Sequence, residues 1–256
     1  MDLVWDIYLT NSLKVSTRSK RGKGTRRRVE PENTIPRNWE NFLRDERNKT
    51  ELFSYLAGKV VSANIPEGKE IVSTQARNVI SNTMRPLTQV APCTQEEADG
   101  RLLLHVADCV AQGLTNILVK TVDTDVVVLS VAFFHHLGLQ QLWVEMGSGK
   151  HLRYIAAHQV AETLGKSKAA ALPAFYAFSG CDTVSAFVGR SKKTAWDVWN
   201  VFHDVTPAFV TLSTVPVTID DDTFQRLQRF VVLLYDRTSS ETDVNIARKV
   251  LFSKKG

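Results

Sequence analysis

Six acidic residues could do chemistry, because each falls at the predicted end of a helix or strand: Asp6, Glu97, Asp99, Asp123, Asp125 and Asp182. Carboxylates that meet in one place repel each other, which raises their pKa values unless a cation holds them together. Hard divalent cations such as Mg²⁺ take oxygen ligands. A pair of such ions can stabilise the attacking and the leaving oxygen when a phosphodiester is cleaved. The pattern therefore indicates divalent-metal chemistry on a phosphate ester.

Each of these acids also has an ordinary structural interpretation. Thr94 and Glu97 have the spacing of a capping box, in which Glu97 would bond the backbone N–H of residue 94. Asp125 could N-cap the helix that follows it, and Asp182 could do the same in its turn. Capping explains each acid singly, but not why five or six carboxylates fall at loops that an α/β sheet brings together. Both interpretations stay open at this point.

Residues 94–136 contain the elements that position most of these acids. Apolar residues recur at helical spacing over residues 102–111, which predicts a helix. Asn116–Val122 is short and rich in β-branched residues, which predicts a strand, and Val126–Phe134 is apolar on nearly every face, as a buried helix would be. This alternation predicts an α/β fold with a mostly parallel sheet covered on both faces. Ligands of such sheets bind beyond the carboxyl ends of the strands, where Asp123 falls.

Patterns elsewhere in the chain extend this fold. Leu3–Trp5 and Lys69–Thr74 are predicted strands, and Leu142–Glu145 and Leu152–Ile155 flank a Gly-rich turn as in a hairpin. The chain then becomes largely helical, with five predicted helical segments: Ala156–Leu164, Ala169–Phe178, Lys192–Phe202, Phe224–Tyr235 and Val244–Phe252.

The net charge of +5 is concentrated in one segment. Residues 14–28 contain eight basic residues and no acid, so that the rest of the chain has 24 basic and 27 acidic residues. Such a localised positive field suits a polyanion, because neutralised phosphates supply much of the affinity for nucleic acid. A solvated charge run or a nuclear-import signal has the same composition.

Composition excludes several other classes of protein. The 256 residues are 43% hydrophobic, which is enough for one large domain or two small ones. The three cysteines have no CxxC spacing, as expected of reduced thiols in an intracellular protein. No apolar run approaches the ~20 residues that a membrane span needs, and the first residues lack the pattern of a signal peptide. We expect a soluble, intracellular protein without a membrane partner, with a nuclear location favoured over a cytoplasmic one.

Several short motifs follow one another in a defined order along the chain. Glu97-Ala98-Asp99 opens a helix, Asp123-Thr124-Asp125 follows a strand, and Gly180-Cys181-Asp182 precedes a Gly-rich turn and a helix. Four further segments are Val4-Trp5-Asp6, Leu13-Lys14, Lys20-Arg21 and Gly189–Asp197. In order and rough separation, from residue 4 to about 200, the motifs resemble the EAE, DxD, GxD, VFD, LK, KR and duplex-clamp segments of the flap-endonuclease superfamily. The catalytic domain of these structure-specific 5′-nucleases has a PIN-like fold.

The resemblance implies a domain organisation. Residues 1–185 would form a PIN-like (Rossmann-like) nuclease core, whose mostly parallel sheet is flanked by helices. Within this core, residues 12–30 would be the basic gateway segment and residues 36–63 a helical insert. Residues 186–256 would form a helical carboxyl region that begins with a segment like the family's helix–two-turn–helix.

The resemblance also implies roles for individual residues. One or two Mg²⁺ or Mn²⁺ ions would be held by Asp99, Asp123, Asp125 and Asp182, with Glu97 and Asp6 completing the carboxylate ring. Lys14 and Arg21 would neutralise charge at the scissile phosphate, and the nucleophile would be metal-activated water. Together with the charge pattern, it places contacts with the nucleic-acid backbone at Arg18, Lys20, Arg26, Arg27, Arg28, Gly189, Lys192 and Lys193.

Two positions depart from the family pattern. The family has a further strand with a metal-binding Asp well before its VFD segment, whereas only five residues precede Asp6 here. Either this sequence is truncated at its start, or the protein lacks this ligand and the strand that presents it. The second turn glycine of the family's clamp is Ser191 here, which would strain any backbone conformation with positive φ.

Three functions are compatible with these patterns. The leading one is metal-dependent phosphodiester hydrolysis in branched or flapped nucleic acid, with DNA favoured over RNA. The second is a catalytically impaired relic, like those of mobile elements, that binds nucleic acid without cleaving it. The third is a non-catalytic α/β interaction protein whose acids are helix caps.

Overall fold

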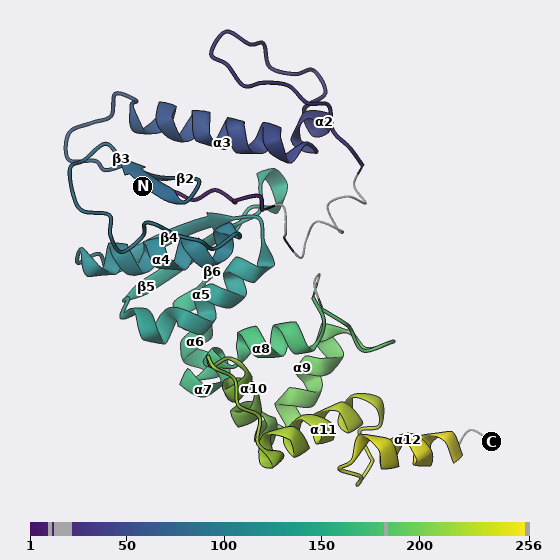
Figure 1. Cartoon of the computed structure of the whole chain (residues 1–256). Helices are drawn as coiled ribbons and strands as arrows, with labels where there is room; N and C mark the ends of the chain where they lie inside the picture. Colours follow the sequence, from purple (N-terminus) through teal and green to yellow (C-terminus); the bar gives the residue numbers. More distant parts are fainter. Residues whose placement is uncertain (10–11, 13–21, 182–183, 254–256) are drawn as a thin grey trace. The chain divides into compact units, whose positions relative to one another are not determined.

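The computed structural model describes residues 1–9, 12, 22–181 and 184–253 and divides into two compact units, residues 1–114 and 115–256 (Figure 1). About half of the chain is helical, and each unit contains one small three-stranded sheet. The α/β class is therefore confirmed. The prediction of one mostly parallel sheet is wrong. There are two sheets among the described residues, and in each the central strand is parallel to one neighbour and antiparallel to the other. The predicted boundary at residue 185 separates a nuclease core from a helical carboxyl region. This division by function stays a prediction.

The described residues of unit 1 combine its sheet with three helices. Their bounds are β1 Asp2–Leu3, α2 Trp39–Leu43, α3 Glu46–Val61, β2 Val72–Gln75, β3 Asn78–Ser81 and α4 Ala98–Ala111. Strand β1 pairs parallel to β2, and β2 pairs antiparallel to β3. Helix α3 packs beside β2 and β3, and the ring of Phe53 on α3 stacks on Trp5 with centroids 4.8 Å apart. The Trp5 backbone N–H donates to Thr74 Oγ1 at 2.8 Å, which fixes the segment after β1 against β2.

Unit 2 begins with the second sheet and continues as helices. Its elements are β4 Asn116–Thr121, α5 Thr124–Leu137, β5 Gln141–Met146, η1 Gly149–His151, β6 Arg153–Ala156, α6 Ala157–Leu164, α7 Lys166–Ala170, α8 Leu172–Phe178, α9 Lys192–Val201, η2 His203–Val205, α10 Thr206–Leu212, α11 Asp221–Tyr235 and α12 Val244–Ser253. Strands β4 and β5 are parallel, and β5 and β6 form the predicted antiparallel hairpin. Helix α5 packs against α6, α7 and α8.

The predicted helix–strand–helix over residues 94–136 is present as α4, β4 and α5. Local signals set these bounds. Helix α5 ends where Gly138 adopts φ 70°, a left-handed conformation that glycine takes without steric cost and that commonly terminates helices.

An aromatic core holds the helical part of unit 2 together. The rings of Phe175, Trp199, Phe209 and Phe230 meet with centroids 4.7–5.7 Å apart, mostly edge to face. Trp199, Phe209 and Phe230 are fully buried, and Trp199 Nε1–H donates to Thr206 Oγ1 at 2.9 Å, so its one polar atom is satisfied. Among the described residues, no helix is both long and apolar enough to cross a membrane.

Candidate metal centre

Two of the predicted metal ligands lie together where β4 leads into α5. Asp123 is the N-cap of α5, and its Oδ1 accepts the backbone N–H of Asp125 at 2.9 Å. The sequence suggested Asp125 as this cap, which is wrong. Asp123 is the residue with the extended backbone that an N-cap needs (φ −99°, ψ 132°), whereas Asp125 already lies in the first helical turn.

The Asp123–Asp125 pair fits a hard divalent cation. The two carboxylates offer oxygen atoms within 4.8 Å of each other, and the cap bond uses only one oxygen of Asp123. Asp123 is exposed and Asp125 is half-buried. The positive end of the α5 dipole also favours both carboxylates, so the pair would be stable here even as a helix cap.

Tyr176 is a neighbour of this pair that sequence reasoning missed. Burial, together with a hydrogen bond to the carboxylate of Asp125, raises the pKa of Tyr176 to about 12. The phenol is thus linked to one of the two carboxylates that would hold the cation. Nothing in the sequence singles out Tyr176, which lies in an apolar helical segment like any core residue.

Lys192, predicted to grip a duplex, has partners within unit 2. Its Nζ donates to the backbone oxygen of Tyr176 at 2.6 Å and to Ser179 Oγ at 3.2 Å, and it also donates to the backbone oxygen of Gly180. It lies 3.7 Å from the centroid of the Tyr176 ring. Burial lowers the pKa of Lys192. The ammonium thus satisfies carbonyls at the end of α8, and its contact with a duplex stays a prediction.

The clamp-like turn is unstrained at its non-glycine position. Gly189 has φ 71°, a conformation that favours glycine. Ser191 has φ −85°, so the strain anticipated for a residue at positive φ does not arise there, and its Oγ caps α9 by accepting from Thr194 N–H at 3.2 Å. Lys193 is exposed and pairs with Asp197 one turn along the helix, at 3.3 Å.

The acids of unit 1 lie around the start of α4. Asp6 Oδ1 accepts the backbone N–H of Ala98 at 2.9 Å, so Asp6 caps a helix 92 residues further along the chain. Glu97 is the N-cap residue of α4, so that Thr94 is not the cap that the capping-box spacing suggested. Asp99 lies half-buried in the first helical turn.

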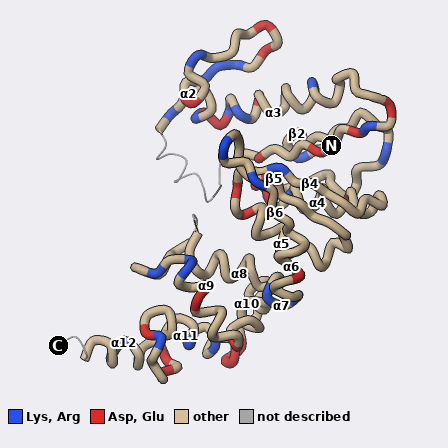
Figure 2. The backbone as a smooth tube through the Cα atoms, turned by 180° about the vertical axis from the view of Figure 1, so that it is seen from behind, with Lys and Arg blue, Asp and Glu red and all other residues tan. Residues whose placement is uncertain are grey.

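Within the described part of the basic segment, residues 22–28, one arginine is already paired. Arg26 forms an ion pair with Glu51 of α3 and donates to Asn48 Oδ1 at 2.9 Å, and this guanidinium holds the pKa of Glu51 below its usual value. The charge of Arg26 is therefore paired with Glu51 within unit 1. Arg27 and Arg28 are exposed. Figure 2 shows the basic positions along the segment that leads to α2.

Five of the predicted site residues lie outside the described part of the chain: Lys14, Arg18, Lys20, Arg21 and Asp182. Their roles stay predictions.

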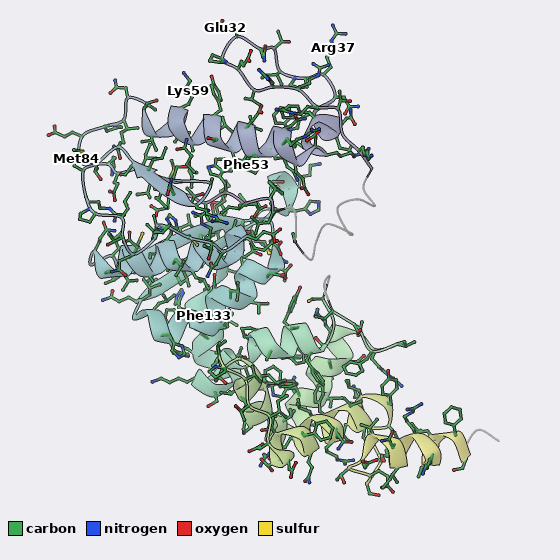
Figure 3. The ribbon with its side chains drawn as sticks, in the orientation of Figure 1. Glu32, Arg37, Phe53, Lys59, Met84 and Phe133 are labelled. Carbon is green, nitrogen blue, oxygen red and sulfur yellow. The ribbon has the colours of Figure 1, made fainter. Side chains whose placement is uncertain are left out.

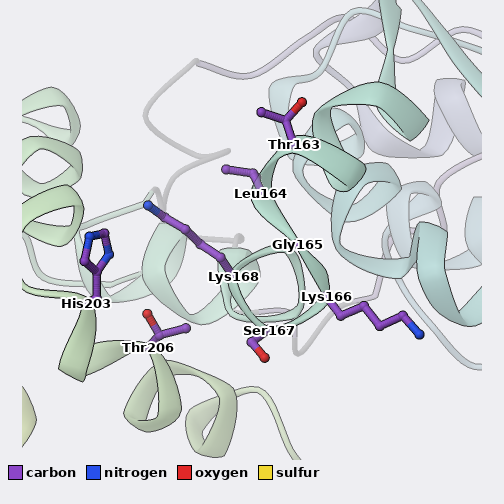
Figure 4. Close-up of a pocket in the computed structure, with 8 residues that line it drawn as sticks. All are labelled: Thr163, Leu164, Gly165, Lys166, Ser167, Lys168, His203 and Thr206. Atoms are coloured by element: carbon purple, nitrogen blue, oxygen red, sulfur yellow. The ribbon is translucent and has the colours of Figure 1, made fainter.

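A cavity of about 520 Å³ in unit 2 is lined by Lys168 and His203, among others (Figure 4). The Lys168 ammonium lies 4.7 and 5.0 Å from the ring centroids of Trp196 and Trp199 and donates to Asn200 Oδ1 at 2.7 Å. Burial lowers the pKa of Lys168. Its charge is therefore held by two aromatic faces on α9, a cation–π arrangement that the sequence did not reveal.

No protein-family model, curated protein or solved structure matches this chain. The resemblance to the flap-endonuclease superfamily therefore rests on the order of the short motifs.

Proposed function

We propose that the protein is a divalent-metal-dependent nuclease that hydrolyses phosphodiesters in branched or flapped nucleic acid, with DNA favoured over RNA. The observation that supports this proposal best is the Asp123–Asp125 pair at the start of α5, with carboxylate oxygens within 4.8 Å of each other. The pair belongs to the DxD motif that, in the superfamily resembled, binds the catalytic metal. The order of the motifs adds Asp99 and Asp182 to the proposed ligand set.

The proposed roles of the residues follow from their chemistry. Asp123 and Asp125 would hold Mg²⁺ or Mn²⁺, and the ion would supply an activated water and neutralise charge on the phosphate. Tyr176 donates to Asp125 and orients its carboxylate, as hydrogen-bonded neighbours of metal ligands commonly do. Lys14 and Arg21 are proposed at the scissile phosphate.

A second candidate is a protein that binds nucleic acid without cleaving it. The observation that favours it is that Asp6 and Asp123 both serve as helix caps, so their carboxylates have a structural use without any metal. Exposed Arg27 and Arg28 would then supply the phosphate contacts.

Cleavage of a labelled flapped DNA in Mg²⁺ and in Mn²⁺ tests the proposal. We expect cleavage by the wild-type chain, its loss with a chelator, and its loss in Asp125→Asn, which keeps the size of the side chain but removes a ligand charge. Asp243→Asn is the control, because Asp243 also caps a helix in unit 2, accepting from Asn245 N–H at 2.8 Å. If the DNA is bound but not cut with either metal, the second candidate replaces the first. Equal cleavage by wild type and Asp125→Asn would show that the pair is not the metal centre.

A further inference from the structure

A cavity of about 640 Å³ lies in unit 1 between residues 27–36 and the helices α2 and α3. Its volume is in the range of sites that bind small ligands. Its walls are mainly apolar and aromatic, with Ile35, Trp39, Phe42, Tyr55 and Leu56 among them. The metal centre proposed above uses none of these residues.

Two arginines line this cavity because α3 holds the backbone on either side of them. Asn48 Oδ1 accepts the N–H of Arg27 at 2.9 Å, and Glu51 Oε2 accepts the N–H of Val29 at 3.1 Å. The neighbouring Arg26 pairs with Glu51, whereas Arg27 and Arg28 line the cavity. Within the described part of the chain, neither Arg27 nor Arg28 forms a salt bridge, so both charges are available to a ligand.

Trp39 gives the same cavity an aromatic wall. One face of its ring stacks on Phe42, with centroids 5.2 Å apart and an angle of 20° between the ring planes, while 43% of the residue remains exposed. A nucleic-acid base that stacks on such a side chain gains about 1–3 kcal/mol and needs no particular base sequence. A planar ring beside two guanidinium groups suits a ligand that joins an aromatic ring to an anion.

We propose that this cavity binds one nucleotide of a single-stranded nucleic acid, with its base against Trp39 and its phosphate at Arg27 and Arg28. Glu30 also lines the cavity, so the charged lining has a net charge of one positive unit. The choice of nucleic acid as ligand rests on the proposed function, but the cavity itself does not depend on the metal ligands.

Binding of labelled oligothymidylate and of an abasic strand of equal length, measured by fluorescence anisotropy with chelator present, tests the inference. We expect Trp39→Leu to weaken oligothymidylate binding about tenfold, which corresponds to roughly 1.4 kcal/mol, and to leave the abasic strand unaffected. The double variant Arg27→Ala, Arg28→Ala should weaken binding of both strands. It should also reduce the slope of log affinity against log salt by about 0.7, the contribution of one phosphate contact on a single strand.

Arg37→Ala is the charge control, because Arg37 is exposed on the same stretch of chain (Figure 3) but is not one of the residues that line the cavity. We expect it to keep the full preference for oligothymidylate over the abasic strand. Thermal melts of each variant check that unit 1 remains folded. Equal effects of Trp39→Leu on both strands, or no effect on either, would overturn the inference, and so would wild-type binding that does not distinguish the strands. Because no metal is present, these results are separate from the cleavage test, and either proposal can fail while the other stands.

Discussion

Replacing Asp123 by asparagine should separate a metal ligand from a helix cap. In the metal-free protein we expect little change in the free energy of unfolding, because asparagine caps helices about as well as aspartate. The carboxylates of Asp123 and Asp125 offer oxygens within 4.8 Å of each other, so relief of their repulsion stabilises the variant by about 1 kcal/mol in a water-like dielectric. The lost attraction between Asp123 and the helix N-terminus costs roughly 0.3–1 kcal/mol, which largely cancels this gain.

A bound divalent cation changes this balance. At a concentration of about 100 times its Kd, an ion that binds only the folded state raises the free energy of unfolding by about 2.7 kcal/mol. Mutation of a residue that hydrogen-bonds a metal ligand typically lowers metal affinity by about 10- to 100-fold. Loss of a ligand itself should lower the affinity by at least as much. At the same concentration Asp123→Asn would then retain only about 0.4–1.4 kcal/mol of the stabilisation. The difference corresponds to a Tm difference of several degrees, at roughly 2–4 °C for each kcal/mol.

Thermal unfolding with increasing Mg²⁺ or Mn²⁺, compared with a chelator, measures this difference. Asp243→Asn is the matched control, because Asp243 accepts the backbone N–H groups of Asn245 and Ile246 at the start of α12 at 2.8 and 2.9 Å. We expect this control to keep the full metal-dependent rise in Tm. The reasoning is refuted if the wild type shows no metal-dependent shift, or if Asp123→Asn shifts as much as the wild type.

Three further predictions concern stability. Asn48→Ala should lower the free energy of unfolding by about 2–3 kcal/mol in urea titrations, because Asn48 is fully buried and its loss leaves backbone groups near it without partners. Phe209→Ala should cost about 3–5 kcal/mol in the same assay, since Phe209 is fully buried at the centre of the aromatic core. The ion pair with Arg26 lowers the pKa of Glu51 in the folded protein below its ordinary value of 4.5, so the stabilisation by this pair is present at neutral pH and is lost as pH falls through that lowered pKa. Glu51→Gln should therefore be less stable than wild type at pH 7, and the two should converge well below pH 4.5; a constant difference across that range would contradict the assignment.

Sequence patterns were sufficient for features that depend on neighbours along the chain. The helical spacing of residues 102–111 and the β-branched run after residue 115 predicted α4 and β4 closely, because apolar periodicity and local propensity act within a few residues. The same patterns placed Asp123 and Asp125 at the end of a strand, which is where the structure has them. The acidic pair is the part of the candidate site that could be predicted in this way.

Features that depend on distant residues were decided only by the tertiary structure. An apolar period identifies a strand but not its partner, so it could not show that β1 pairs with β2 some seventy residues later, or that the strands form two mixed sheets instead of one. The same holds for polar side chains. Asp6 caps α4 and Lys192 satisfies the end of α8, because a polar side chain takes whichever partner the packed chain brings within hydrogen-bond distance, however distant that partner is in the sequence.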